Sequence, residues 1–326
     1  MGRRWSRTAA LGLGAVLLIG GVAAARSPGL VLRGQKWLAP QADTVAALTR
    51  EPAECLVLPQ DERLKLSIEV GRAAFRSPLT LGGQASRVGL SCETCHRAGR
   101  ANPDFAFPGV SGAPGTADVT SSLFSSHRGD GRFNPKPIPD LAAPKTQLKV
   151  AQSGPELETF IHGLVTQEFD GVETPAAVLR GLVDYVRALS PLGCPAEADR
   201  AIDVADLLND ADRALAAAES LVAHGDSTAA VAMVRAARAR LFLIDERYTP
   251  PGLARDRRAL RRIDRDLSGV AEGLRTLRPE ARANLARTRQ DLSDLRPRLR
   301  RSAPRSLFNP TLLRAAMDGR LPQPPS

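Results

Sequence analysis

The sequence predicts an all-α fold in two parts, a helical domain at residues 61–194 and an antiparallel helical bundle of coiled-coil hairpins at 197–301. Three observations predict it. Apolar residues recur at helical spacing on both sides of a C-x-x-C-H motif. Beyond residue 199 they recur in heptad-like stripes. The composition also changes near Cys194: seven of the nine Phe lie between Phe75 and Phe169, whereas the later part is rich in Ala, Leu, Arg and Asp.

The N-terminus carries the features of an export signal. Basic residues precede an apolar run from Ala9 to Ala25, and small residues near the end of this run suit a cleavage site. The run is just short of the roughly 20 apolar residues that a spanning helix needs. We therefore favour a cleaved signal peptide at 1–25, and the alternative is an uncleaved anchor in the inner membrane. Both predict a periplasmic protein, with residues 26–60 as a linker into the first domain.

The motif Cys92-Glu93-Thr94-Cys95-His96 is the attachment signature of a c-type haem. Two thiols one helical turn apart can add to the two vinyl groups of one haem, and His96 then supplies the proximal nitrogen to the iron. A structural zinc site is disfavoured because it needs four ligands, and the chain has no second C-x-x-C and no H-x-x-x-H. A thioredoxin-like redox pair is disfavoured because no βαβ pattern surrounds the motif. We expect one haem c per chain.

The other two cysteines, Cys55 and Cys194, lie on either side of the motif. An oxidising compartment favours a disulfide between them. The alternative is a pair of buried free thiols. A disulfide would tie the entry of the first domain to its exit.

Two helices are predicted to frame the first domain. Residues 61–75 place Gly71 and Phe75 on one helical face, and residues 174–189 place Tyr185 on the apolar face of a helix that begins at Thr174. A small residue beside an aromatic one lets a second aromatic helix cross closely. This pairing resembles class I cytochromes c, in which the first and last helices cross beside the haem, and the resemblance implies a class I cytochrome c-like domain.

The stretches 68–79 and 90–96 resemble the start of the bacterial dihaem cytochrome c peroxidase and MauG-like group, which carries "GxxLFxDPxLS" before "SCxxCH". The segments 115–124 and 130–132 are similar to that group's "RNxPTLxN" and "DGR". The match covers about residues 61–190. This chain departs from the group in having one C-x-x-C-H where the group has two, so the internal electron relay of a dihaem peroxidase is missing.

The sixth iron ligand separates an electron carrier from a catalyst. Class I cytochromes use a Met from the loop before the last helix, but no Met lies in 61–194. The candidates, in order of preference, are His162, His127 and an open or water-bound site. A Met that reaches over from the second domain is the last choice.

The segment after Cys194 carries no evident ligand set. Its apolar stripes predict four helices with short loops at 224–227, 248–252 and 278–279, followed by a Pro-rich tail at 302–326 that ends in disorder. Because it offers no chemistry, we interpret the bundle as a docking or dimerisation module.

A formal net charge of +10 accompanies a globular composition of 43% hydrophobic and 25% charged residues. No nucleic-acid motif appears, so we interpret the charge as a solvated surface that attracts an acidic redox partner or anionic lipid. The expected function is one-electron transfer in the periplasm with an unidentified redox partner protein. The alternatives are a haem peroxidase-like enzyme with an open distal site, and a sensor or assembly subunit in which the bundle carries the function.

Overall fold

The computed structural model describes residues 32–33, 37–144, 148 and 150–320. These residues are mostly α-helical, with two short antiparallel ladders, β1–β4 and β2–β3. The all-α class is therefore confirmed. The expected export segment at 1–25 lies outside the described residues. In the part of the chain that is described, no helix combines the length and the apolar character that crossing a bilayer takes.

The elements of the first half are short apart from α2 and α7. In chain order they are α1 (Thr44–Thr49), β1 (Arg50–Pro52), α2 (Glu62–Phe75), α3 (Pro78–Leu81), α4 (Gly83–Arg87), α5 (Cys92–Cys95), η2 (Arg97–Gly99), β2 (Thr116–Ala117), β3 (Lys136–Pro137), α6 (Glu156–Gly163), the π-helical turn η4 (Leu164–Glu168), α7 (Ala176–Ala188), η5 (Pro191–Gly193) and β4 (Asp199–Ala201).

The second half is a bundle of four long helices with a short C-terminal helix. Its elements are α8 (Val204–Ala223), α9 (Ser227–Arg247), η6 (Pro251–Leu253), α10 (Ala254–Arg275), α11 (Ala281–Ser302), η7 (Ala303–Arg305) and α12 (Pro310–Met317). The breaks between the long helices contain the predicted loops at 248–252 and 278–279, and the predicted loop at 224–227 is one residue too long because α9 begins at Ser227. Asp203 and Asp226 cap α8 and α9 by accepting hydrogen bonds from backbone N–H groups of the first turn.

Helices α2 and α7 cross at two glycines. A Cβ built on Gly71 would lie 1.8 Å from the carbonyl oxygen of Gly181, so the two backbones are in direct contact. Beside this crossing the rings of Phe75 and Tyr185 pack edge to face, with centroids 5.0 Å apart. The sequence predicts Gly71 and Phe75 against Tyr185, and the structure adds Gly181 as the second small residue.

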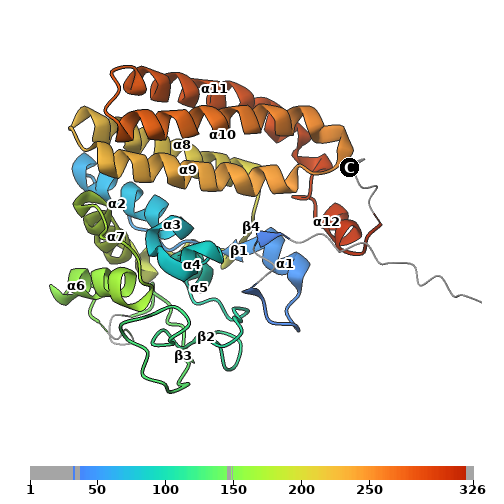
Figure 1. Ribbon diagram of the computed structural model, residues 1–326. Coiled ribbons are helices and arrows are strands. Elements are labelled where there is room, and N and C mark those ends of the chain that lie inside the picture. Colours follow the sequence, from blue (N-terminus) through green and yellow to red (C-terminus); the bar gives the residue numbers. More distant parts are fainter. Residues whose placement is uncertain (1–31, 34–36, 145–147, 149, 321–326) are drawn as a thin grey trace, which may run out of the picture.

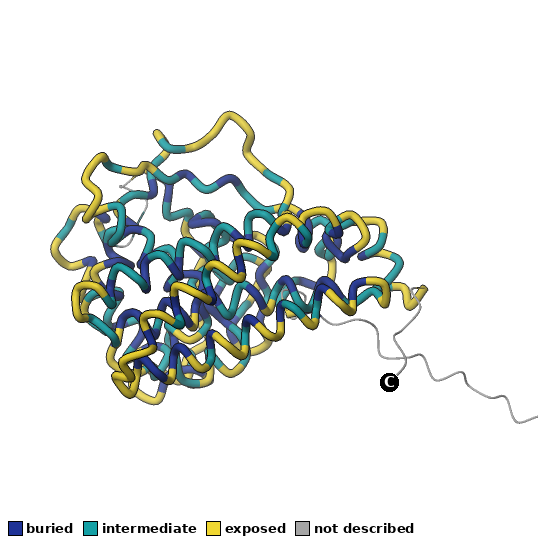
Figure 2. Tube along the Cα trace, turned by 90° about the horizontal axis from the view of Figure 1, so that it is seen from above, coloured by how far each residue is buried: buried dark blue, intermediate teal, exposed yellow. Residues whose placement is uncertain are grey.

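One core runs through both halves of the molecule. Buried side chains of α2 and α7, such as Ile68 and Leu182, belong to the same apolar cluster as those of α8 to α11, such as Leu215 and Leu267. Figure 1 shows α2 and α7 lying against α8 and α9, with α10 and α11 above them. In Figure 2 the buried positions line the inner sides of these helices, and the exposed positions lie outside. The border between the two predicted domains, near Cys194, therefore does not interrupt the core.

A separate apolar cluster brings the two ends of the described chain together. Leu32 and Leu48, from before and within α1, pack against Leu307 and Leu313 near α12. Asn309 caps α12 through its side chain, and a proline occupies the first position of the helix. The sequence assigns 26–60 to a linker and 302–326 to a tail. In the structure both segments instead contain a helix, and α1 and α12 pack against each other through a few apolar side chains.

Candidate functional site around the C-x-x-C-H motif

Helix α5 places the two cysteines of the motif one turn apart. A capping box starts it: the N–H of Ser91 donates to Oγ1 of Thr94 at 3.0 Å, and the Ser91 side chain faces the backbone of Thr94. Burial raises the pKa of the Cys92 and Cys95 thiols to about 12. Neither thiol is therefore a thiolate at neutral pH, which argues against a thioredoxin-like redox pair.

His96 ends α5 with its ring held in one orientation. Its Nδ1 donates a hydrogen bond to the carbonyl oxygen of Pro139 at 3.0 Å, which fixes the tautomer and leaves Nε2 with a lone pair. The ring of Phe75 lies beside it, with centroids 6.4 Å apart. Burial lowers the pKa of the His96 imidazole to about 4, so the ring is neutral at pH 7, the form that binds metal. A histidine that donates one nitrogen to a carbonyl and keeps the other is arranged as metal-ligating histidines are.

The half-buried thiols border an apolar cluster. Cys92 and Cys95 pack against a group of aliphatic and aromatic side chains from α3, α4, the loops at 88–90 and 105–138, and η4, whose members are Leu81, Ala85, Leu90, Phe105, Phe107, Val110, Ala117, Phe124, Ile138 and Val165. Trp37 closes one side by stacking on Phe107, with ring centroids 4.1 Å apart. Apolar walls, two thiols and one oriented imidazole nitrogen are the groups that covalent haem attachment uses, so the residues present fit that cofactor.

Glu93, between the two cysteines, enters a buried network of charges. Its Oε1 accepts a hydrogen bond from the N–H of Ala98 at 3.1 Å, and its Oε2 lies 3.5 Å from Nε of Arg76. Arg76 is only 7% exposed and also binds Glu54 at 3.0 Å and Asp210 of α8 at 2.7 Å. The motif is thus tied to the bundle through one guanidinium. No sequence signal marks this network, since its members lie up to 156 residues apart in the chain.

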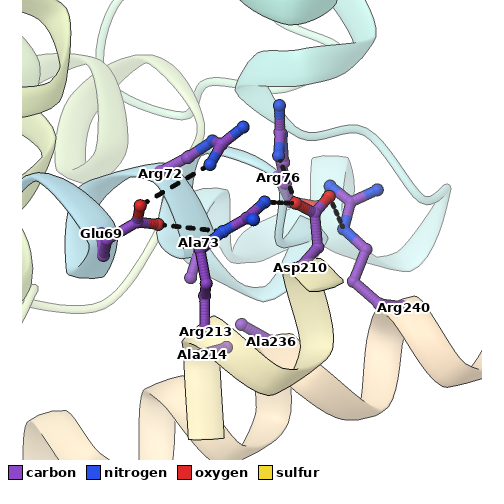
Figure 3. A pocket seen from close by; sticks show the side chains of 9 residues that line it. All are labelled: Glu69, Arg72, Ala73, Arg76, Asp210, Arg213, Ala214, Ala236 and Arg240. Carbon is purple, nitrogen blue, oxygen red and sulfur yellow. Dashed lines mark hydrogen bonds and ion pairs between the residues drawn. The ribbon is translucent and has the colours of Figure 1, made fainter. Parts of the chain in front are cut away.

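Figure 3 shows Asp210 surrounded by the guanidinium groups of Arg76, Arg213 and Arg240. Burial alone raises the pKa of the Asp210 carboxyl, but Arg76 and then Arg240 more than offset this, and the pKa is lowered to about 2. The cavity between these side chains measures about 10 Å³, which is room for one water molecule. This cluster therefore holds α2 to the bundle and has no space for a substrate.

Glu54 occupies the other side of Arg76. Its carboxylate accepts a hydrogen bond from the Tyr185 hydroxyl at 2.7 Å and also binds Arg72. Burial raises the pKa of Glu54, but Arg76 and Arg72 more than offset it, and the net shift is downward. Glu54 directly precedes Cys55, so the start of the first domain is fixed to both α2 and α7.

The two histidines predicted as sixth ligands each have a carboxylate partner. Nε2 of His162, on α6, lies 2.9 Å from Glu173, and Nδ1 of His127 lies 3.0 Å from Asp170. Their side chains are 36% and 64% exposed. No hydrogen bond or ring contact joins either histidine to the described residues Cys92–His96.

The methionines of the second half pack in two different apolar clusters. Met233 is fully buried within the bundle, and Met317 packs against the cluster of α1 and α12. Cys92 also borders the cluster that contains Met233, whereas Cys95 borders neither of these two clusters.

The arginines near the motif are engaged by protein groups. Arg97 donates to the carbonyl oxygens of Ala47 and Arg50, and Arg100 binds Asp140 at 2.7 Å. These contacts pin the segment after His96 to α1, β1 and the loop that carries Pro139.

Cys55 and Cys194 form a disulfide with an S–S distance of 2.02 Å, which is the pairing that the sequence predicts. It closes 139 residues that include α2, the motif and α7. The ladder of β1 with β4 lies next to it and pairs Arg50 with Ala201.

Among the described residues, no group of three or more His, Cys, Asp or Glu side chains is placed to hold a metal ion by itself. No family model matches the chain, and neither a curated protein nor a solved structure matches it.

Proposed function

We propose that the protein is an exported monohaem c-type cytochrome that transfers single electrons in the periplasm. The observation that carries the proposal is the motif geometry: two thiols on one helical turn, followed by His96 with Nδ1 donating to Pro139 and Nε2 available. Cys92 and Cys95 would hold the haem covalently and His96 would be its proximal ligand. The bound haem supplies an iron that alternates between ferric and ferrous states.

The surrounding residues orient and shield this site. The Pro139 carbonyl holds the imidazole in one tautomer and strengthens its basicity. The apolar cluster that borders the thiols keeps water from one side, which is one means by which a protein sets a haem potential. Glu93, through Arg76, keeps α5 at a fixed position relative to α2 and α8. A rigid site lowers the structural rearrangement that accompanies electron transfer.

A haem peroxidase-like enzyme with an open distal site is the second candidate. It is favoured by the engagement of His162 with Glu173 and of His127 with Asp170, because a histidine held by a carboxylate must leave it before it can bind iron. The two candidates differ in the spin state of the ferric protein. A sixth strong ligand gives a low-spin iron, whereas an open or water-bound site gives a high-spin one.

Covalent haem attachment is tested by producing the protein with a c-type maturation system and staining a denaturing gel for haem. The wild type should stain, Cys92→Ala and Cys95→Ala should stain weakly, and the double variant should not stain. The control is Cys55→Ala/Cys194→Ala, which removes the same number of cysteines and should keep the haem. A wild type without covalent haem refutes the proposal.

The sixth ligand is tested by the visible and electron paramagnetic resonance spectra of the ferric protein. If His162 binds the iron, His162→Ala converts a low-spin spectrum to high-spin, while His127→Ala leaves it low-spin; the reverse result assigns His127. His224→Ala is the control, because this residue caps α8 and its Nδ1 donates to the carbonyl of Ser220. A high-spin wild type supports the enzyme.

A further inference from the structure

The positive charge of the chain is concentrated on the outer layer of the bundle. Between residues 254 and 305 there are 16 Arg and seven Asp or Glu, a net charge of +9, whereas the whole chain has +10. The rest of the protein is therefore nearly neutral. A uniform solubilising surface would spread this charge, so its segregation points to a partner.

Seven of these arginines are exposed and lie in α10, at the end of α11 or in η7, and we call this set the basic face. They are Arg255, Arg258, Arg262, Arg265, Arg300, Arg301 and Arg305. The start of α10 and the end of α11 lie together there, because Asp256 binds Arg298 at 2.5 Å and Ser302 at 2.7 Å. The other arginines nearby bind acids of the protein itself, as Arg257 binds Asp245 at 3.0 Å.

None of the seven has an ion-pair partner in the described part of the chain. The exposed carboxylates Asp266 and Asp294 border the basic face and leave it with a net charge of +5. Unpaired guanidinium groups exposed on two adjacent helices are suited to an anionic surface, which can contact several of them at once.

Residues 32–33, the first that the structure describes, lie near this face. Leu32 packs against Leu307, two residues beyond Arg305, and the guanidinium of Arg33 lies 3.9 Å from the ring centroid of Phe242 on α9. The apolar run 9–25 precedes Leu32 by six residues, which span at most about 20 Å when fully extended. A membrane-inserted run would therefore bring the bilayer surface to the basic face.

The C-x-x-C-H motif lies on the other side of α8 and α9 from α10 and α11. In Figure 1, α10 and α11 lie above α8 and α9, and α5 lies below them. A redox protein bound to the basic face would be separated from His96 by a layer of helices roughly 10 Å thick. This step rests on the proposed function, and it favours lipid over an acidic redox protein as the occupant.

We propose that the basic face binds the surface of an anionic lipid bilayer and turns the C-x-x-C-H side away from the membrane. Each arginine that reaches such a surface strengthens binding about fivefold, and salt weakens the attraction. Binding should therefore depend on anionic lipid, on low ionic strength and on these particular arginines.

The test is sedimentation of the full chain with phosphatidylcholine vesicles that contain or lack phosphatidylglycerol. The ratio of the two partition coefficients removes any contribution from an uncleaved apolar N-terminal run, because such a run would add equally to binding of both kinds of vesicle. The variant R258Q/R262Q/R265Q/R301Q should lower this ratio at least about tenfold. The control R63Q/R87Q/R132Q/R180Q removes the same charge from exposed arginines on other elements and should leave the ratio nearly unchanged.

Circular dichroism checks that both variants keep their helices. Equal losses in the two variants would overturn the proposal, because net charge would then account for binding. A wild-type ratio near one would also overturn it, and binding of a polyglutamate peptide through the same arginines would then identify an acidic protein as the occupant. Vesicle binding is measured for protein with and without covalent haem. Failure of haem attachment, which would refute the proposed function, is thereby distinguished from failure of lipid binding.

Discussion

Replacing Arg76 with Met should be among the most destabilising single changes in this protein. The guanidinium is 7% exposed and lies 2.7, 3.0 and 3.5 Å from Asp210, Glu54 and Glu93. Met preserves most of the side-chain length but leaves the carboxylates without their shared cation. Breaking a buried pair by removing one partner costs about 3–5 kcal/mol, because a buried charge is left uncompensated.

The three carboxylates do not lose the same share of their cationic partners when Arg76 is replaced. Arg72 still binds Glu54, and Arg213 still binds Asp210, whereas Arg76 supplies the nearest cation to Glu93. We therefore expect a loss of about 4 kcal/mol at pH 7, centred on Glu93. Glu93→Gln in the same chain should restore part of it, because the amide carries no charge.

The pH dependence has a definite sign. Burial raises the pKa of Glu93 in the wild type, and Arg76 is the largest opposing influence. Without Arg76 this pKa rises further. A group whose folded pKa lies above its unfolded one is stabilising at low pH and loses that contribution as pH rises. The loss in free energy of unfolding caused by Arg76→Met should thus become smaller as the pH is lowered from 7 to 5.

Urea unfolding at the two pH values measures both effects. Arg63→Met is the matched control, since Arg63 lies on the same helix, is exposed and should change stability by no more than about 0.5 kcal/mol. A deficit for Arg76→Met below about 1 kcal/mol, or one that does not change with pH, would show that the network does not hold the motif as we argue.

Three further predictions concern the framework around the site. Gly71→Ala should cost about 3 kcal/mol or more in urea unfolding, because its Cβ would overlap the backbone of α7, whereas Gly269→Ala, which meets nothing within 4 Å, should stabilise α10 by about 0.5–1 kcal/mol. Removing the disulfide with Cys55→Ala/Cys194→Ala should cost up to about 5 kcal/mol by the chain-entropy argument for 139 residues; in the haem-loaded wild type, where haem would block Cys92 and Cys95, two thiols labelled in the unreduced, unfolded protein would refute the bond. The pKa of Asp210, raised by burial but lowered overall by Arg76 to about 2, should supply about 2 kcal/mol that is present above pH 4 and lost as pH falls toward 2; acid unfolding of Asp210→Asn should lack this loss.

The features that the sequence predicts correctly are those encoded over a few residues. Helical periodicity fixes the extents of α2, α7 and α8 to α11, because side chains three and four residues apart share a face whatever the helix packs against. The spacing within the C-x-x-C-H motif places Cys92 and Cys95 on one turn for the same reason. Phe75 and Tyr185 could also be matched in advance, since each is the aromatic residue on a predicted crossing face.

Other features depend on which faces meet, and periodicity does not contain that information. The sequence gives no reason to pair Gly71 with Gly181, or to place Leu313 of a Pro-rich tail against α1. The partners of His162 and His127 come from the loop at 170–173, whose path is set by tertiary packing.

The tertiary structure alone decides the electrostatics. Arg76 follows a predicted helix and would pass for a solvated surface residue, yet Glu54, Glu93 and Asp210 arrive around it from three other parts of the chain. The basic face likewise exists only because α10 and α11 lie side by side with their unpaired arginines outward. Sequence determines which charges a protein has and which helix carries them. Whether a charge is buried and neutralised or exposed and available is decided by long-range packing, because Coulomb energies depend on distance and on exclusion of water.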